Sequence, residues 1–264
     1  MKSLLLLAVL APVAPALAVP INYTETWEGY SLGTADPGYN ANWPAIPGQN
    51  VFPIIVAPAG LAGPAHPASN ALEQGIGTVF GIENNLADGV EMPVGAYVEP
   101  TAASPLVVGI WWNPANGTNR QGNNFIFELL GGGAVQTGIS TSRVAGGGDN
   151  NPYYFNGSSW SRQTLGRYQS QGWSHVYLTL TPAGGGGYDV SMTLTGQDGT
   201  NSASLPALTY SGGFDAIRIR ALGTTTLRSW IDDPYITGGV IIPEPATGSL
   251  LALGGLVVLR RKRR

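Results

Sequence analysis

Glycine and proline are spread so densely along this chain that its central part cannot form a long helix. The sequence has 38 glycines and 20 prolines in 264 residues, and one or the other interrupts almost every window of ten between residues 20 and 240. No window there sustains apolar residues at the spacing of three and four that an amphipathic helix requires. The central part must therefore be built from short strands and turns.

Alternating apolar and polar residues predict where those strands lie. In HVYLTLT (175–181) the apolar side chains occupy every second position, and YDVSMTL (188–194) repeats the pattern. The segment PAGGGG (182–187) lies between them, so we expect a hairpin. Further strands are predicted at residues 78–83, 94–98, 105–112, 125–130, 214–222 and 228–236. Short strands at such spacing are typical of one all-β sandwich or barrel.

A family resemblance makes this expectation more specific. It rests on TETWEGYSLG (24–33), on GWSHVYLTLTPAGGGGYDVSMTL (172–194), and on FDAIRIRAL (214–222) followed by SWIDDPYITGG (229–239). This order resembles the concanavalin A-like (laminin G-like) jelly-roll superfamily. The resemblance implies a jelly-roll β-sandwich over residues 19–238, in which the first and last strands are neighbours.

The first eighteen residues have the features of a secretory signal peptide. Lys2 precedes an apolar run (4–10), and Ala16 and Ala18 are small residues at the positions that a signal peptidase reads. The run is too short to span a bilayer. We therefore expect residues 1–18 to be removed and the chain to be exported.

The other end of the chain is a tail with three parts. A linker (239–245) ends with Pro243, Glu244 and Pro245, and an apolar segment (246–259) follows it. That segment would extend about 21 Å as a helix, whereas a stable span usually needs about 20 residues. The chain then ends in a basic cluster that suits the cytoplasmic side of a membrane. The cluster consists of Arg260, Arg261, Lys262, Arg263 and Arg264.

This order closely resembles the PEP-CTERM sorting signal of Gram-negative bacteria. The resemblance implies recognition by an exosortase-type sorting protease, with processing near residues 243–245. It also implies a transient stay in the inner membrane through a short transmembrane helix (246–259) with a basic cytoplasmic end (260–264). Delivery to the cell envelope, the outer surface or the extracellular matrix would follow. Many proteins with this signal are linked to extracellular polysaccharide.

The composition excludes several kinds of partner and chemistry. Without both ends, the body has seven basic residues, all arginine, against fifteen acidic ones, a formal net charge of −8. Such a body does not attract nucleic acid, which needs clustered cations. The sequence has no cysteine, which excludes thiol catalysis and thiolate metal sites.

The catalytic motifs are weak, and we expect no catalytic residues. GYSLG (29–33) matches G-x-S-x-G, but the residues after it cannot form the helix that a nucleophilic Ser31 needs. His66 and His175 are isolated and offer no metal-ligand spacing. Jelly-roll glucanases usually carry their carboxylates on one strand as E-x-D-x-x-E, and here no Glu precedes an Asp by two residues. A pair from different strands stays open, so a secreted polysaccharide hydrolase or lyase is the alternative function.

Ligand binding has two sets of candidates. Asp149 and Asp198 lie in oxygen-rich loops and are candidate calcium ligands, although Asx-turns explain both loops equally well. Trp111, Trp112 and Trp160 are candidate glycan contacts, because a tryptophan on a concave sheet face can stack on a sugar ring. Packing in the sandwich core is the alternative for each of them.

The predicted function combines these observations. We expect an exported, non-enzymatic cell-envelope or extracellular-matrix protein that binds a glycan. We expect no cofactor apart from calcium at the candidate ligands. The expected partners are the sorting protease and an extracellular polysaccharide.

Overall fold

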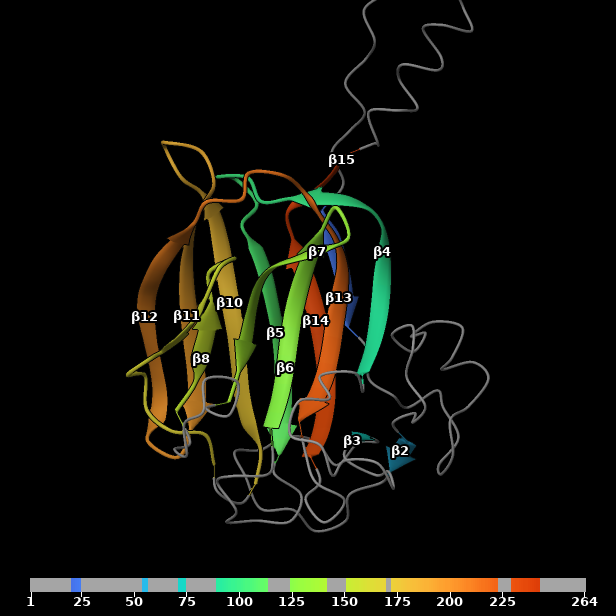
Figure 1. Cartoon of the computed structure of the whole chain (residues 1–264), viewed down its shortest axis with the longest axis vertical. Helices are drawn as coiled ribbons and strands as arrows, with labels where there is room; N and C mark the ends of the chain where they lie inside the picture. Colours follow the sequence, from blue (N-terminus) through green and yellow to red (C-terminus); the bar gives the residue numbers. More distant parts are fainter. Residues whose placement is uncertain are drawn as a thin grey trace, which may run out of the picture.

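Fifteen strands in two antiparallel sheets make up the part of the chain that the computed structural model describes. This part comprises residues 20–24, 54–56, 71–74, 89–113, 124–141, 151–169, 172–222 and 229–242. Within these ranges the structure is all-β and has no helix. The long strands run roughly along the long axis of the molecule, in two layers (Figure 1).

The first sheet, sheet A, has eight strands. Its path runs β12 (Gly199–Leu208), β11 (Tyr188–Gly196), β10 (Ser174–Pro182), β5 (Leu106–Asn113), β14 (Ser229–Gly238), β3 (Ala71–Gln74) and β2 (Ile54–Val56). Off this path, β1 (Ile21–Thr24) pairs with the end of β14. The first described strand therefore lies beside a late one, as the jelly-roll resemblance implied.

The second sheet, sheet B, has seven strands. Its order is β15 (Val240–Ile242), β4 (Gly89–Glu99), β13 (Phe214–Leu222), β6 (Asn124–Gly131), β7 (Ala134–Ser140), β8 (Tyr153–Phe155) and β9 (Trp160–Arg162). The three central strands β4, β13 and β6 are long, whereas β8, β9 and β15 are short.

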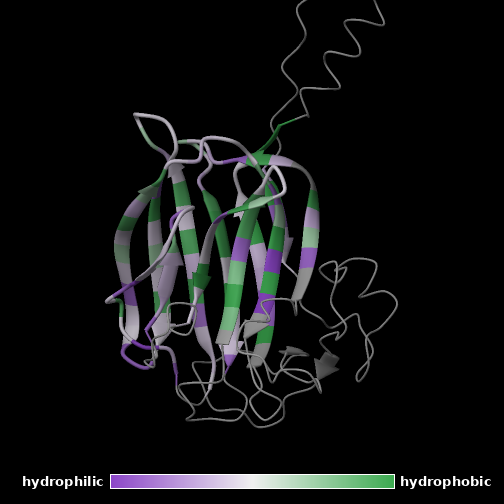
Figure 2. Cartoon of the chain, viewed as in Figure 1, coloured by the Kyte–Doolittle hydropathy of each residue, from purple (hydrophilic) through white to green (hydrophobic). Residues whose placement is uncertain are grey.

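Side-chain alternation explains how the two sheets share one core. Val176, Leu178 and Leu180 on β10 and Ile217 and Ile219 on β13 belong to the same buried cluster. Hydrophobic and hydrophilic bands alternate along strands of both sheets (Figure 2). Because successive strand residues point to opposite faces, every second residue must point away from this core. Each sheet therefore has an outward face.

The structure confirms most of the strands that the sequence predicted. The hairpin between β10 and β11 forms as expected, with Ala183 N donating to Gly187 O at 3.0 Å. The predicted strands at 94–98, 105–112, 125–130, 214–222 and 228–236 correspond to β4, β5, β6, β13 and β14. The predicted strand at 78–83 and the loop residues around Ser31, His66 and Asp149 lie outside the described residues. We did not predict the long strands β7 and β12, which have few apolar residues at alternate positions, or the short strands β1, β2, β3, β8 and β9.

The predicted linker needs a correction. Residues 240–242 form β15 at the edge of sheet B, where they pair with β4. Gly238 and Gly239 have φ values of 79° and 60°, and a Cβ atom on Gly238 would lie 1.9 Å from Pro105 O. Only glycine suits such a conformation and such a contact, and it lets the chain cross from sheet A to sheet B. The sandwich therefore continues to Ile242, and the Pro-Glu-Pro motif follows it directly.

The two ends of the chain lie outside the described residues. The signal peptide with its Ala16 and Ala18, the sorting motif, the apolar segment and the basic cluster therefore stay predictions. Among the residues that the structure does describe, no helix has the length and apolar character needed to cross a membrane.

Candidate functional site

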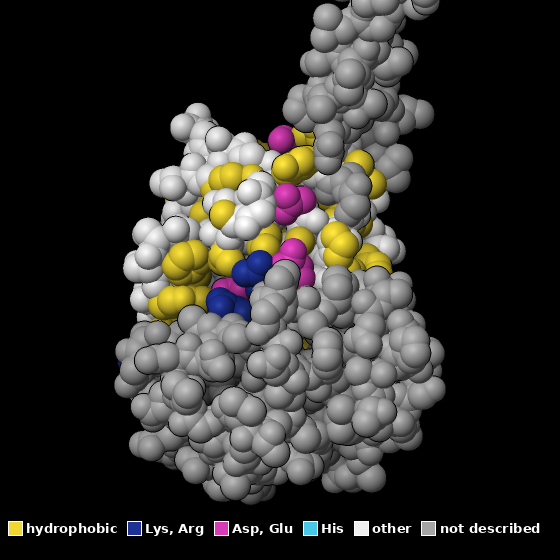
Figure 3. Space-filling view, turned by 45° about the vertical axis from the view of Figure 1, so that its right-hand side comes forward, with side chains coloured by type: hydrophobic (Ala, Val, Ile, Leu, Met, Phe, Trp, Pro, Cys, Tyr) yellow, Lys and Arg dark blue, Asp and Glu magenta, His cyan; other side chains and the backbone are white. Residues whose placement is uncertain are grey.

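One row of side chains crosses the outward face of sheet B. Strand register aligns Glu91, Arg218, Glu128, Gly138, Phe155 and Trp160, one each on β4, β13, β6, β7, β8 and β9. Their sequence neighbours Ile217, Phe127 and Tyr154 belong to the core, so these six residues point away from it. We call them the sheet B row. Basic and acidic side chains gather on the molecular surface and are bordered by hydrophobic ones (Figure 3).

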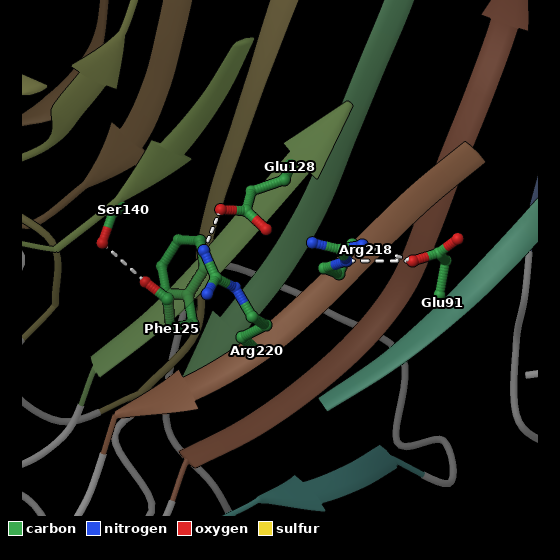
Figure 4. A network of polar contacts seen from close by, with 6 residues as sticks. All are labelled: Glu91, Phe125, Glu128, Ser140, Arg218 and Arg220. Carbon is green, nitrogen blue, oxygen red and sulfur yellow. Dashed lines mark hydrogen bonds and ion pairs between the residues drawn. The ribbon is translucent and has the colours of Figure 1, made fainter. Parts of the chain in front are cut away.

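Ion pairs connect the polar end of this row (Figure 4). Arg218 donates from Nε and Nη2 to Glu91 Oε2, at 2.9 and 2.7 Å. Arg220, two residues along β13, donates from Nη2 to Glu128 Oε1. The two arginines therefore balance the two carboxylates when all four groups are charged.

Glu128 is the most unusual group of the site. Only 2% of it is exposed, and its second carboxylate oxygen, Oε2, has no hydrogen-bond partner. Burial raises the pKa of the Glu128 carboxyl, and the attraction of Arg220 opposes this shift only in part. A buried oxygen without a partner is costly. Glu128 can therefore hold a proton more readily than an exposed glutamate, and a ligand can reach Oε2 only when the atoms that cover it move.

The other end of the row is aromatic. The rings of Phe155 and Trp160 lie 5.2 Å apart at a tilt of 37°, and both residues are half-buried. Gly138 separates this pair from Glu128, and a Cβ atom there would lie 2.7 Å from Phe127 O. The row thus has a position without a side chain between its polar end and its aromatic end. Strand spacing places the backbones of Glu128 and Phe155 about 9.6 Å apart.

Sheet A carries a second group of rings on its outward face. Trp111 lies on β5, His175 and Tyr177 lie on β10, and Tyr235 lies on β14; we call these four residues the sheet A cluster. Trp111 and His175 stack with ring centroids 4.5 Å apart and an interplanar angle of 14°. His175 also lies 5.3 Å from the Tyr177 ring and 5.8 Å from the Tyr235 ring. All four side chains are half-buried.

The three tryptophans that we predicted as glycan contacts lie in different parts of the sandwich. Trp111 lies in the sheet A cluster, and Trp160 lies in the sheet B row, so both stay candidates for glycan contact. Trp112 is only 3% exposed and packs against Phe125 and Tyr168 in the core. The prediction of a glycan contact at Trp112 was wrong, because alternation turns its side chain inward.

The calcium prediction at Asp198 is not supported by its contacts. Both carboxylate oxygens accept hydrogen bonds from Arg167, at 2.8 to 3.1 Å. Hydrogen bonds from the Arg167 side chain lower the pKa of Asp198. In the described ranges, no three His, Asp or Glu side chains lie close enough together to hold a metal ion. The second candidate, Asp149, lies outside those ranges.

Sequence reasoning missed the pairing of Glu91 and Glu128 with the arginines of β13. The partners are far apart in the sequence, and only strand order brings them together. One local signal existed, since FIFELL (125–130) places a single carboxylate among five apolar residues. A charge in such a buried strand needs a partner. The alternation of Arg218 and Arg220 with isoleucines indicated an outward face but did not identify that partner.

Comparison with known proteins adds information on the fold. No family model and no curated protein matches this chain. A double mutant of the alginate lyase Aly36B, in complex with an alginate tetrasaccharide, is 8% identical, with a TM-score of 0.51 over 85% of this chain and 100% of that chain. The globular domain of T. cruzi calreticulin is also 8% identical, with a TM-score of 0.51 over 81% of this chain and 87% of that chain.

A third solved structure is similar over a large part of its length. The endo-β-1,4-glucuronan lyase from Trichoderma reesei is 12% identical, with a TM-score of 0.47 over 74% of this chain and 90% of that chain. At such low identities a likeness concerns the fold alone. This chain has the jelly-roll-like β-sandwich of the first two structures.

Proposed function

We propose that this protein is an exported, non-enzymatic glycan-binding protein, and that the sheet B row holds the glycan. The observation that carries this proposal is the alignment of an aromatic pair with buried and half-buried polar groups on one outward row. Sugar rings stack their apolar faces on aromatic side chains, and their hydroxyl groups bond to planar polar groups. Trp160 and Phe155 would supply the stacking surface.

Glu128 and Arg218 would bind the hydroxyl groups. Glu128 Oε2 is a buried acceptor without a donor, and a sugar hydroxyl would supply that donor once the atoms that cover the oxygen move aside. Gly138, which is itself buried, contributes no side chain between the rings and the carboxylate. Since the two arginines and two glutamates balance each other, the row has no excess charge to attract an anionic sugar.

A glycan array tests the binding site. We expect the body, residues 19–242, to bind at least one polysaccharide, and we expect Trp160→Ala and Glu128→Gln to weaken this binding at least fivefold. Gln197→Ala, in the exposed turn between β11 and β12, is the matched control and should bind like the parent. If both site variants fold and bind as well as the parent, the glycan is not held by this row.

The sequence supports the proposed location. The signal peptide would direct export, and the tail would be recognised by an exosortase-type protease while residues 246–259 stay in the inner membrane. Processing near residues 243–245 would release an acidic body to the cell envelope or the extracellular matrix. Because β15 ends at Ile242, we expect the cut on the C-terminal side of that residue, where it leaves sheet B intact.

Mass spectrometry of the exported protein from its native host tests this route. The expected C-terminal peptide ends between Ile242 and Ala246, and it should be absent from a strain without the sorting protease. Recovery of a peptide ending in Arg264 at full abundance from the exported protein would contradict processing. The tail would then be a simple membrane anchor.

One observation favours a second candidate function, a polysaccharide hydrolase or lyase. Glu91 and Glu128 lie on the same outward row with Arg218 between them, so the fold does assemble a carboxylate pair from different strands. A general acid needs a raised pKa, and burial gives Glu128 that property. Both carboxylates are bound by arginines, however, which holds them away from a substrate. We therefore place binding first.

Activity assays separate the two functions. Purified body would be incubated with neutral and acidic polysaccharides, and the release of reducing ends and of ultraviolet-absorbing unsaturated ends would be measured. We expect neither product. Release that Glu128→Gln abolishes, while the variant still binds the polysaccharide, would establish the enzymatic function instead.

A further inference from the structure

We infer that the outward face of sheet A is a second glycan-binding surface, so that one molecule can hold two polysaccharide chains on opposite sides of its sandwich. This inference rests on the proposed function of the sheet B row and extends it. The two outward faces are separated by the shared core, and packed sheets lie about 10 Å apart. A sugar unit bound on one face therefore cannot contact the other face at the same time.

The sheet A cluster has the shape of a platform. Tyr177 and Tyr235 lie in register with Gly109 of β5, one on each side of it. A Cβ atom on Gly109 would lie 2.5 Å from Tyr235 Oη and 2.6 Å from Tyr177 Cβ. The missing side chain lets the Tyr235 ring lie across the sheet toward His175, with 3.3 Å between Tyr235 Oη and His175 Nε2. Rings from three adjacent strands thus form one continuous surface.

Rows of hydroxyl groups continue from this platform toward the edge of the sheet. Tyr177 is in register with Thr193, whose Oγ1 lies 2.7 Å from Ser202 Oγ. His175 is in register with Thr195, whose Oγ1 lies 2.9 Å from Thr200 Oγ1. Hydroxyl groups donate and accept hydrogen bonds with equal ease, which suits the hydroxyl groups of a sugar chain.

The charge of this face identifies the class of ligand. The strands β5, β10 and β12 contain no Asp, Glu, Lys or Arg, whereas β11 contains Asp189 and β14 contains Asp232 and Asp233. Asp232 is buried in register with Trp111 and Asp189 is exposed, so these carboxylates disfavour an anionic sugar chain on this face. The ligand that fits it is a neutral, hydroxyl-rich polysaccharide. Such a ligand stacks on the rings and bonds to the hydroxyl rows.

A bridging assay tests the second surface. The exported protein would be bound to an insoluble polysaccharide that retains it, and a fluorescent soluble chain would then be added. The soluble probes are a β-glucan, a mannan and dextran, with polygalacturonate as the acidic comparison. We expect bound protein to capture at least one neutral probe, at least tenfold more than it captures polygalacturonate. Absence of capture of every neutral probe would overturn the inference.

Two variants assign the capture to sheet A. Trp111→Ala with Tyr177→Ala removes two rings, and Thr179→Arg adds a long charged side chain to the half-exposed outward face without touching the core. Both should reduce capture at least tenfold while attachment through sheet B stays within twofold of the parent. Trp111→Phe keeps a ring and should retain most of the capture. If Thr179→Arg and the double variant fold and still capture the probe, the second surface does not exist.

The same assay distinguishes this inference from the proposed function. Failure of the sheet B proposal would appear as unchanged attachment in Trp160→Ala. If sheet A does not bind a glycan, the protein should attach normally to the insoluble polysaccharide but capture no soluble probe. Capture of the probe that the sheet A variants leave unchanged would have the same meaning. Capture of an envelope protein instead of a neutral glycan, in the same format, would also overturn the inference.

Discussion

The outward faces of the two sheets differ in their side chains. Sheet B carries ion pairs there, whereas sheet A carries aromatic rings and hydroxyl groups. On sheet B, Glu128 is only 2% exposed and forms a buried ion pair with Arg220. On sheet A, half-buried rings and hydroxyl groups cover the strands, and the buried Asp232 lies in register with Trp111. The comparison shows that a buried charge makes a face depend on its partner and on pH, whereas a face of rings depends mainly on shape.

The largest expected effect concerns the buried ion pair. Arg220→Ala leaves the Glu128 carboxylate buried without its cation, and we expect a loss of about 3–5 kcal/mol in the free energy of unfolding near neutral pH. Arg218→Ala is the matched variant on the same strand. Its partner, the Glu91 side chain, is 30% exposed, so the loss should stay below about 1 kcal/mol. Urea unfolding measures both values, and equal losses would contradict this ranking.

The pH dependence of that loss sharpens the prediction. Because the folded-state pKa of Glu128 is raised, the folded protein binds this proton more tightly than the unfolded chain does. The contribution of this group to stability is therefore full below the unfolded pKa and declines as the pH rises through the folded pKa. We expect Arg220→Ala to be less destabilising at about pH 4 than at about pH 7, since a protonated Glu128 needs no cation. A larger loss in acid would contradict the buried-carboxylate account.

The next effect compares the central glycines of the two faces. Gly138→Ala would place a Cβ atom 2.7 Å from the Phe127 carbonyl oxygen, which belongs to the backbone and cannot rotate away. We expect a loss of about 1–3 kcal/mol. Gly109→Ala would place a Cβ atom 2.5 Å from Tyr235 Oη and 2.6 Å from Tyr177 Cβ, which is fixed to its strand, so its loss should be at least as large, with a larger change in near-ultraviolet circular dichroism. Thermal unfolding and that spectrum together check the difference.

A smaller effect concerns glycan affinity, which should depend on pH at the sheet B row. If the ionised Glu128 accepts a hydroxyl group, affinity at the sheet B row should fall as the pH drops through its raised pKa. The loss should be about 0.5–1.5 kcal/mol, the net value of one hydrogen bond. Calorimetric titration at several pH values measures it, using a sheet A variant to isolate the row. Glu128→Gln should have weaker binding at neutral pH and no such pH dependence.

The smallest effect concerns the exposed ion pair of Arg167 and Asp198. Both side chains are well exposed, at 48% and 37%, and solvent screens their attraction. We expect Asp198→Asn to leave the thermal midpoint unchanged within error, with or without added calcium. A calcium-dependent rise in the midpoint that Asp198→Asn removes would restore the calcium site that the sequence suggested.

The candidate site divides into a part that could be predicted and a part that could not. Trp111 and Trp160 were selected from the sequence, since a tryptophan in an alternating strand points either inward or outward. Trp112 received the same prediction because consecutive residues give no sign of which one faces the core. Glu91 and Glu128 could not be paired with the arginines, because β4, β6 and β13 come from distant parts of the chain.

The sequence by itself determined that this protein is an all-β sandwich and where most of its long strands lie. Between residues 20 and 240, glycine and proline interrupt almost every stretch long enough for a helix, and the alternation of apolar residues is a local property of each strand. The tertiary structure alone decided which strands are neighbours, that residues 240–242 complete sheet B, and which residues share each outward row. The physical reason is that strand pairing is non-local: register between distant segments depends on how both sheets bury their apolar sides together.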